Sequence, residues 1–145
     1  MWTINPQNDP MHKVLARMSA YASEMLENVG TERRFEVAEG LESLTLPMEK
    51  RKDFYLIFKE AIHNCAKYAH ARQVEVALEK AGSLLILNVR DNGQGFGIQQ
   101  AESKARNLGG NGLRNMRSRA AALGGTLEVV SAPGAGTEVR LLLPL

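Results

Sequence analysis

Apolar side chains recur along this chain with two different spacings, and the spacing separates expected helices from expected strands. Over 11–29 the apolar positions follow helical intervals, and Gly30 ends the pattern. A stronger helical pattern covers 49–69, where a broad apolar stripe is flanked by polar positions. Residues 33–38 have the short pattern of a strand, and 40–47 are expected to form a loop.

Four further apolar runs predict strands. Apolar and polar residues alternate over 74–78, as in a strand with one buried face, and 84–89 is nearly all apolar, as in a central strand. The runs 127–130 and 139–143 flank a segment rich in Gly and Pro, which predicts a hairpin at the end of the chain.

Between these strands, helical spacing returns over 113–123, and Gly124-Gly125 suits the C-cap of that helix. Residues 96–109 have few apolar positions and are expected to be a loop. The elements together predict an α/β fold: a two-layer sandwich in which helices cover one face of a mixed sheet.

Length and composition narrow the class of protein. With 145 residues, 44% of them hydrophobic and 23% charged, the chain has the profile of one soluble globular domain. A net charge of +2 gives no basis for nucleic-acid binding, and the single Cys65 excludes an internal disulfide or a cysteine zinc site. Without a signal peptide or a long apolar run, we expect a cytoplasmic segment without direct membrane contact.

Two glycine clusters have the most distinctive chemistry. Asp91-Asn92-Gly93-Gln94-Gly95 follows a predicted strand, and Gly109-Gly110-Asn111-Gly112 precedes a predicted helix. Neither has the third glycine of the dinucleotide-binding fingerprint, and the chain has no Gly-Lys pair for a P-loop. If the chain binds phosphates, it does so in another way.

Asp91 is a candidate for binding a nucleotide base. A carboxylate at the end of a buried strand can accept a hydrogen bond from the 6-amino group of adenine, whereas guanine would present a carbonyl oxygen there. Gly93 and Gly95 would let the backbone approach the base closely. The alternative is an ordinary Asn-Gly turn after a strand.

The second cluster is a candidate anion site. Free backbone N–H groups at a helix start favour phosphate, and Gly110 and Gly112 would leave them accessible. The alternative is a flexible linker that ends where the helix begins.

Glu60, Asn64 and Lys67 lie along one edge of the apolar stripe of the long helix. The amide oxygen of Asn64 suits Mg²⁺, Glu60 can orient or deprotonate a water or hydroxyl group, and Lys67 can meet a phosphate. Alternatively, the three are the polar flank of an amphipathic helix. His63 and His70 are expected at the surface or at a helix end.

In this order and spacing, the motifs resemble those of the GHKL ATP-binding superfamily, and most closely the catalytic domain of two-component sensor histidine kinases related to nitrate sensors. The resembling segments are FKEAIHNCAKYA at 58–69 (the N box), DNGQGF at 91–96 and GNGLRNM at 110–116 (the two glycine boxes), and GAGTEV at 134–139 (the last hairpin).

The resemblance implies the Bergerat fold, whose sheet is mixed and mostly antiparallel, together with a division of roles. Asp91 would bind the adenine amine, with Thr137 supporting that contact through water. Asn64 would ligate Mg²⁺, and Glu60 would be the candidate base. The remaining positions that it assigns to nucleotide binding are Gly93, Gly95, Gly110, Gly112 and Leu113, with 96–109 as a mobile lid.

The resemblance also implies a division of the chain and a set of partners. Residues 1–30 resemble the end of a dimerisation region, and 31–145 resemble the ATP-binding domain. The family's phosphoacceptor histidine is usually followed by an acidic residue, but Lys13 follows His12, so we expect the acceptor on a dimerisation domain outside this chain. A response regulator would then receive the phosphoryl group.

Two alternatives stay open from the sequence. An anti-sigma-factor serine kinase shares these motifs and would phosphorylate a protein serine. A degenerate ATP domain would act only as an interaction module and would not bind nucleotide.

Overall fold

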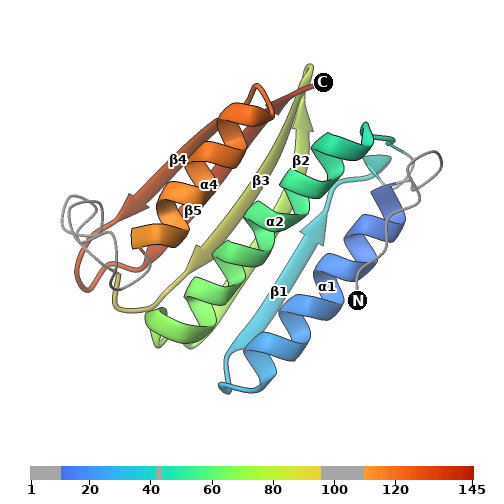
Figure 1. Ribbon diagram of the computed structural model, residues 1–145. Helices are drawn as coiled ribbons and strands as arrows, with labels where there is room; N and C mark the ends of the chain where they lie inside the picture. The colour runs from blue at the N-terminus through green and yellow to red at the C-terminus, as the bar shows by residue number, and fades with distance from the viewer. Residues whose placement is uncertain (1–10, 42–43, 96–109) are drawn as a thin grey trace.

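The computed structural model describes residues 11–41, 44–95 and 110–145, which form a five-stranded sheet with helices on one face (Figure 1). The elements are α1 (Met11–Glu27), β1 (Glu32–Val37), α2 (Met48–Asn64), the π-helical turn η2 (Cys65–Ala69), β2 (Gln73–Ala81), β3 (Leu84–Asp91), α4 (Gly110–Ala122), β4 (Thr126–Ser131) and β5 (Thr137–Pro144). The predicted α/β sandwich is confirmed, with each described element within a few residues of its expected range. The expected loop at 96–109 lies outside the described residues.

The sheet has the strand order β1-β2-β3-β5-β4. Only β1 and β2 pair in parallel, and the other three pairs are antiparallel. The strand predicted to be central, β3, does lie in the middle, between β2 and β5. Its inward-facing residues Leu85, Leu87 and Val89 are at most 2% exposed, because the helix layer covers them.

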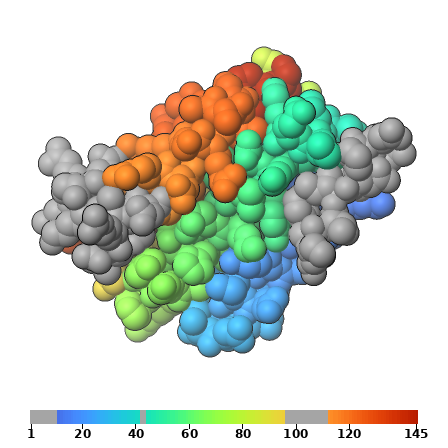
Figure 2. Space-filling view, viewed as in Figure 1, coloured from blue at the N-terminus to red at the C-terminus, as the bar shows by residue number. Residues whose placement is uncertain are grey.

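The helix layer is centred on α2, which lies between α1 and α4 (Figures 1 and 2). The predicted apolar stripe of α2 is buried against the sheet; Phe58 is fully buried and meets Phe35 of β1 edge-to-face, with ring centroids 6.2 Å apart. Among the described residues, no helix is both long enough and apolar enough to cross a membrane.

The opposite face of the sheet is open and compatible with water because charges of opposite sign are opposed across the strands. Glu75 of β2 pairs with Arg90 of β3, which in turn pairs with Glu138 of β5. In the other direction along β5, Arg140 pairs with Glu128 of β4. Cross-strand pairs of this kind stabilise a sheet modestly, and they place charged side chains on the face that also exposes Val130 of β4.

Two helices end at a residue in the left-handed conformation. The α4 helix ends as predicted, at Gly124 with φ of 71°. Gly124 N–H donates to Ala121 O and Gly125 N–H donates to Ala120 O, the bonds of a Schellman motif. The α2 helix continues into the π turn η2, which ends at His70 in the left-handed conformation with φ of 52°. His70 is thus the helix-end residue that the sequence predicted.

Asn92 ties the end of β3 to the start of β2. Its Oδ1 accepts hydrogen bonds from the backbone N–H of Arg72 at 2.9 Å and of Gln73 at 3.0 Å. The tight Asn-Gly turn that the sequence left as an alternative is not formed, because neither Asn92 nor Gly93 has the positive φ that it requires. The side chains of Asn92 and Asp91 instead face opposite sides of the strand end.

Replacing Asn92 with Ala removes an acceptor shared by two backbone N–H groups. We expect the free energy of unfolding in urea to fall by about 1 kcal/mol, since the bonds are partly exposed to water. Asn92→Asp keeps the acceptor and is the matched control, with stability near that of the wild type. An Ala variant as stable as the wild type would contradict this role.

Candidate functional site

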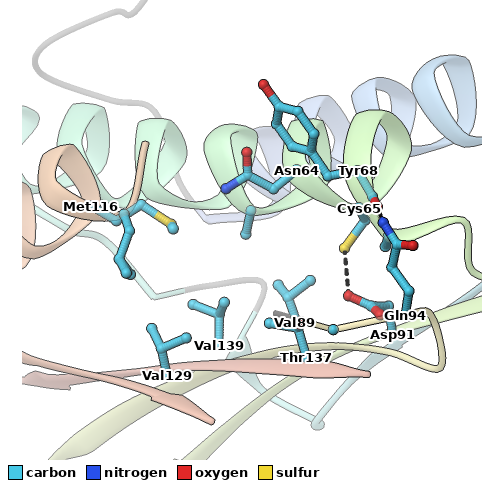
Figure 3. Close-up of a pocket in the computed structure, with 14 residues that line it drawn as sticks. Asn64, Cys65, Tyr68, Val89, Asp91, Gln94, Met116, Val129, Thr137 and Val139 are labelled. Carbon is cyan, nitrogen blue, oxygen red and sulfur yellow. Dashed lines mark hydrogen bonds between the residues drawn. The ribbon is translucent and has the colours of Figure 1, made fainter. Parts of the chain in front are cut away.

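A cavity lies between the helix layer and the sheet, at the end of β3 (Figure 3). At about 100 Å³, it is several times larger than the roughly 10–15 Å³ that one water needs. Most of its wall is apolar and comes from Ala61, Cys65, Ala69, Val89, Leu113, Met116, Val129 and Val139. The polar residues of the lining are Asn64, Tyr68, Asp91, Gln94 and Thr137, and the hydroxyl of Tyr68 points away from the sheet (Figure 3). An apolar slot with few polar groups is typical of a site for a small, flat ligand.

Asp91 is the buried carboxylate of this cavity, with only 6% of the residue exposed. The backbone N–H of Gly93 donates to its Oδ1 at 2.8 Å, and the Cys65 thiol donates to its Oδ2 at 3.5 Å. Each carboxylate oxygen can accept two hydrogen bonds, so the group is held in place and keeps acceptor capacity for a ligand.

Cys65 was not predicted as a site residue, yet it lies beside the carboxylate (Figure 3). Burial, and then the neighbouring Asp91 carboxylate and its hydrogen bond, raise the pKa of the thiol well above its ordinary value of 9.0. The thiol is therefore protonated at neutral pH. It acts as a donor to Asp91 and is a poor nucleophile.

Thr137 lies opposite Asp91 on the neighbouring strand β5. Its hydroxyl oxygen is 2.8 Å from the hydroxyl oxygen of Ser131, across the β4–β5 pair. Thr137 also lines the cavity next to Asp91, and its predicted support of an adenine contact stays a prediction.

Asn64 faces the cavity from the helix layer, above the sheet residues (Figure 3). Its Oδ1 is buried and accepts no hydrogen bond from the described residues, which costs free energy unless a ligand occupies it. An unpartnered amide oxygen fits Mg²⁺, which takes oxygen ligands and keeps several waters and phosphate oxygens. Within the described ranges, no group of three or more His, Cys, Asp or Glu side chains could hold a metal by itself.

The two glycines after Asp91 make room for neighbouring backbone. A Cβ at Gly93 would collide with the carbonyl of Ala69, and a Cβ at Gly95 would collide with the carbonyl of Ala132. Gly95 also has φ of 66° and lines the cavity, whereas Gly93 does not. At Gly93 the close approach in the structure is to the end of η2, and its predicted approach to a base stays a prediction.

Glu60 lies outside this cavity. It lines a more polar groove among α1, α2 and α4, with Tyr21, Lys59 and Arg119. Its Oε2 is 3.5 Å from Nδ1 of the partly exposed His63. Glu60 also lies against the first turn of α4, where a Cβ on Gly112 would come within 2.9 Å of its carboxyl carbon.

The other residues predicted for the site lie in different places. Leu113 lines the cavity, and Gly110 begins α4, so the glycine cluster does open a helix. Lys67 is exposed on η2, with its Nζ 5.4 Å from the centroid of the Tyr68 ring, and it lines neither the cavity nor the groove. The predicted lid at 96–109 lies outside the described residues.

Three polar residues of the cavity region were missed by sequence reasoning: Cys65, Tyr68 and Gln94. The backbone N–H of Gln94 donates to Ala69 O at 2.7 Å, and its side chain donates to Tyr68 O at 2.6 Å. These contacts join segments that are far apart in the sequence. For Cys65 and Tyr68 the sequence contained one signal, their helical spacing: residues 61, 64, 65 and 68 share a face of the helix.

Comparison with known proteins identifies relatives. The sequence model of one protein family, described as "Histidine kinase-, DNA gyrase B-, and HSP90-like ATPase", matches residues 49–145. The sensor protein VraS of Staphylococcus saprophyticus is 31% identical over 109 residues, which are 75% of this chain and 30% of that protein. VraS of Staphylococcus epidermidis is 32% identical over 111 residues, 77% of this chain and 28% of that protein. The chain thus spans less than a third of the length of these relatives.

Solved structures share the fold. The histidine kinase domain of the blue-light activated histidine kinase from Erythrobacter litoralis matches 99% of this chain and 66% of its own, with a TM-score of 0.77 and 20% identity. The Acinetobacter baumannii histidine kinase AdeS matches 99% of this chain and 68% of its own, with a TM-score of 0.74 and 15% identity. The architecture predicted from the sequence is therefore that of histidine kinase domains.

The raised pKa of Cys65 makes stability depend on alkaline pH. In the unfolded chain the thiol ionises near pH 9, while in the folded protein it stays protonated, so the folded state binds more protons. We expect the free energy of unfolding to be unaffected at pH 7 and to fall above about pH 8.5, by up to about 1.4 kcal/mol for each pH unit.

Urea unfolding at pH 7.5, 8.5 and 9.5, under reducing conditions, measures this dependence. Cys65→Ala and Cys65→Ser have no ionisable group at this position and should show a flatter dependence than the wild type. Equal slopes in all three proteins would contradict the assignment.

Proposed function

Because the chain belongs to the family of histidine kinase-, DNA gyrase B- and HSP90-like ATPases, we propose that it is the ATP-binding catalytic domain of a sensor histidine kinase. Membership of a family of ATPases implies that it binds ATP. The reaction proposed is transfer of the ATP γ-phosphoryl group to a histidine on a dimerisation domain.

The observation that carries this proposal is the buried Asp91 carboxylate inside an apolar slot. The slot walls, among them Val89, Val139 and Met116, suit the faces of a purine ring, and Asp91 accepts a hydrogen bond from its exocyclic amine. A ligand with a carbonyl at that edge would face the carboxylate with two unpaired acceptors, and the site would reject it.

The triphosphate then extends from the slot toward Asn64 and the start of α4. Gly110 and Gly112 belong to the first turn of this helix, where unpaired N–H groups and the helix dipole favour negative charge. Asn64 would hold Mg²⁺ through its Oδ1. When bound, the ion neutralises phosphate charge during transfer.

The acceptor imidazole is supplied by another segment of the protein. Glu60, on α2 beside the first turn of α4 and outside the cavity, would receive or orient a proton, with His63 next to it. The surface Lys67 adds a positive charge near the end of η2. In this arrangement, residues 1–30 form the end of the dimerisation region, and residues 31–145 form the catalytic domain on the cytoplasmic side. A response regulator is the downstream partner.

Calorimetric titration of the purified chain with ATP and GTP tests the base site. We expect binding of ATP and not of GTP, and a loss of ATP affinity of at least about 30-fold in Asp91→Asn, equivalent to about 2 kcal/mol. Glu128→Gln removes a carboxylate from the exposed strand β4 and is the control, with affinity unchanged. If the wild type binds neither nucleotide, the proposal fails and the chain is better described as an interaction module.

The role of Asn64 is tested by measuring ATP affinity with and without Mg²⁺. Asn64→Ala should abolish the gain that Mg²⁺ gives and leave the affinity measured in EDTA nearly unchanged, because only the metal ligand is removed. Asn88→Ala is matched to it: Asn88 also has a buried Oδ1 without a partner among the described residues, but it does not line the cavity. A Mg²⁺ effect that survives in Asn64→Ala would remove this residue from the metal site.

A further inference from the structure

The polar groove that contains Glu60 is a further hollow of the helix layer, and the proposed function uses it only at that residue. It lies over α2, between α1 and α4 (Figure 1), and its volume of about 270 Å³ is many times the roughly 10–15 Å³ that one water needs. Side chains of all three helices line it, among them Tyr21 of α1, Leu56 of α2 and Asn115 of α4. A hollow of this size can receive several side chains of a partner.

The groove runs along α2 because α4 packs antiparallel to that helix. At one end Gly112, in the first turn of α4, lies against Glu60, and at the other end Nη1 of Arg119 donates to Oδ1 of Asp53 at 3.1 Å. Seven residues separate the two contacts in both helices (53 to 60 and 112 to 119), a rise of about 10 Å. The groove therefore has two ends about two helical turns apart.

One face of α2 forms the floor of the groove. Leu56, Glu60 and His63 have the spacing i, i+4, i+7, so they share that face. A floor of this kind, with a helix on either side, fits a further helix laid along α2, since the side chains of one helix pack between those of another. We therefore expect the partner segment to be helical.

Cations line both sides of the groove. Nζ of the exposed Lys59 lies 5.4 Å from the centroid of the Tyr21 ring, on the side of α1. On the other side Arg119 is oriented by Asp53, and a guanidinium has five N–H donors, so one such bond does not use up its donor capacity. Within α4, Gly110–Ala122, there are three arginines and no acidic residue. The walls of the groove thus favour carboxylates of a partner.

The Glu60 end of the groove has a different chemistry. Its carboxylate lies beside His63 and against the first turn of α4, which the anionic end of the nucleotide reaches in the proposed function. We infer that the groove recognises the acceptor segment by its charge: the acceptor imidazole enters beside Glu60, and acidic side chains one and two helical turns away on the same face meet Lys59 and Arg119. This inference rests on the proposed function, which supplies the acceptor histidine.

The test uses three synthetic helical peptides of equal length, each with one central histidine. The first peptide has glutamates about one and two helical turns to either side of the histidine, on its face; the second has lysines there; the third has the glutamates on the opposite face. Fluorescence anisotropy measures their affinity for the purified chain in the presence of Mg²⁺ and a non-hydrolysable ATP analogue. We expect the first peptide to bind at least about tenfold more tightly than either of the others.

Reversing one charge of the groove separates recognition from folding. Lys59→Glu should weaken binding of the first peptide at least about fivefold and strengthen binding of the lysine peptide, which a merely misfolded variant would not do. Lys80→Glu makes the same change of charge at an exposed position of β2 and should alter either affinity by no more than about twofold. If Lys59→Glu does not fold, Lys59→Gln takes its place and should also weaken binding of the first peptide.

Equal affinities for the two glutamate peptides, or equal effects of Lys59→Glu and Lys80→Glu, would overturn the inference, since attraction between net charges would then account for the binding. A chain that binds the ATP analogue but none of the peptides would also overturn it and would leave the ATP site intact. A chain that binds no nucleotide would overturn the proposed function, and the inference with it.

Discussion

The site depends on the close approach of two chain segments: the end of the π-helical turn and the end of β3. Gly93 lies against the carbonyl of Ala69, and Gln94 donates hydrogen bonds to the carbonyls of Ala69 and Tyr68. This junction fixes how far the helix layer stands from the sheet at this end. Since β3 is the central strand and ends here, its last inward-facing residue, Asp91, is held at the floor of the space that remains. The cavity is thus a consequence of how the two layers are joined.

The hydrogen bonds around Asp91 explain why a carboxylate is tolerated in an apolar place. One oxygen has a backbone donor and the other has the thiol of Cys65, whose raised pKa keeps its proton in place. A serine hydroxyl would be a stronger donor to the carboxylate. The protonated thiol is a weaker donor, but it also packs like an apolar group. Cys65 therefore belongs both to the core and to the site.

Much of the fold could be predicted because it follows from local pattern. Alternation in β2, the apolar run of β3 and the Gly124-Gly125 stop are all properties of a few neighbouring residues. The π turn could not be predicted, since Cys65 and Ala69 continue the apolar face that an α-helix would also have. A π turn has i→i+5 hydrogen bonds and therefore more residues per turn than an α-helix, so Lys67 does not continue the helix face of Glu60 and Asn64. The contacts of Gly93, Gln94 and Ser131 join different elements, and a single sequence read by itself contains no record of such contacts.

The separation of Glu60 from Asp91 follows from the packing of α4 on α2. Met116 contributes to the wall of the base cavity and also to the groove that contains Glu60, so a single buried side chain divides an apolar compartment from a polar one. The first turn of α4 lies next to both, with Leu113 in the cavity wall and Gly112 against Glu60. A ligand that fills the cavity with its base and reaches this turn with its anionic end must pass Asn64 on the way. In the proposed function, base recognition and proton handling would therefore occupy different compartments, and α4 contacts both.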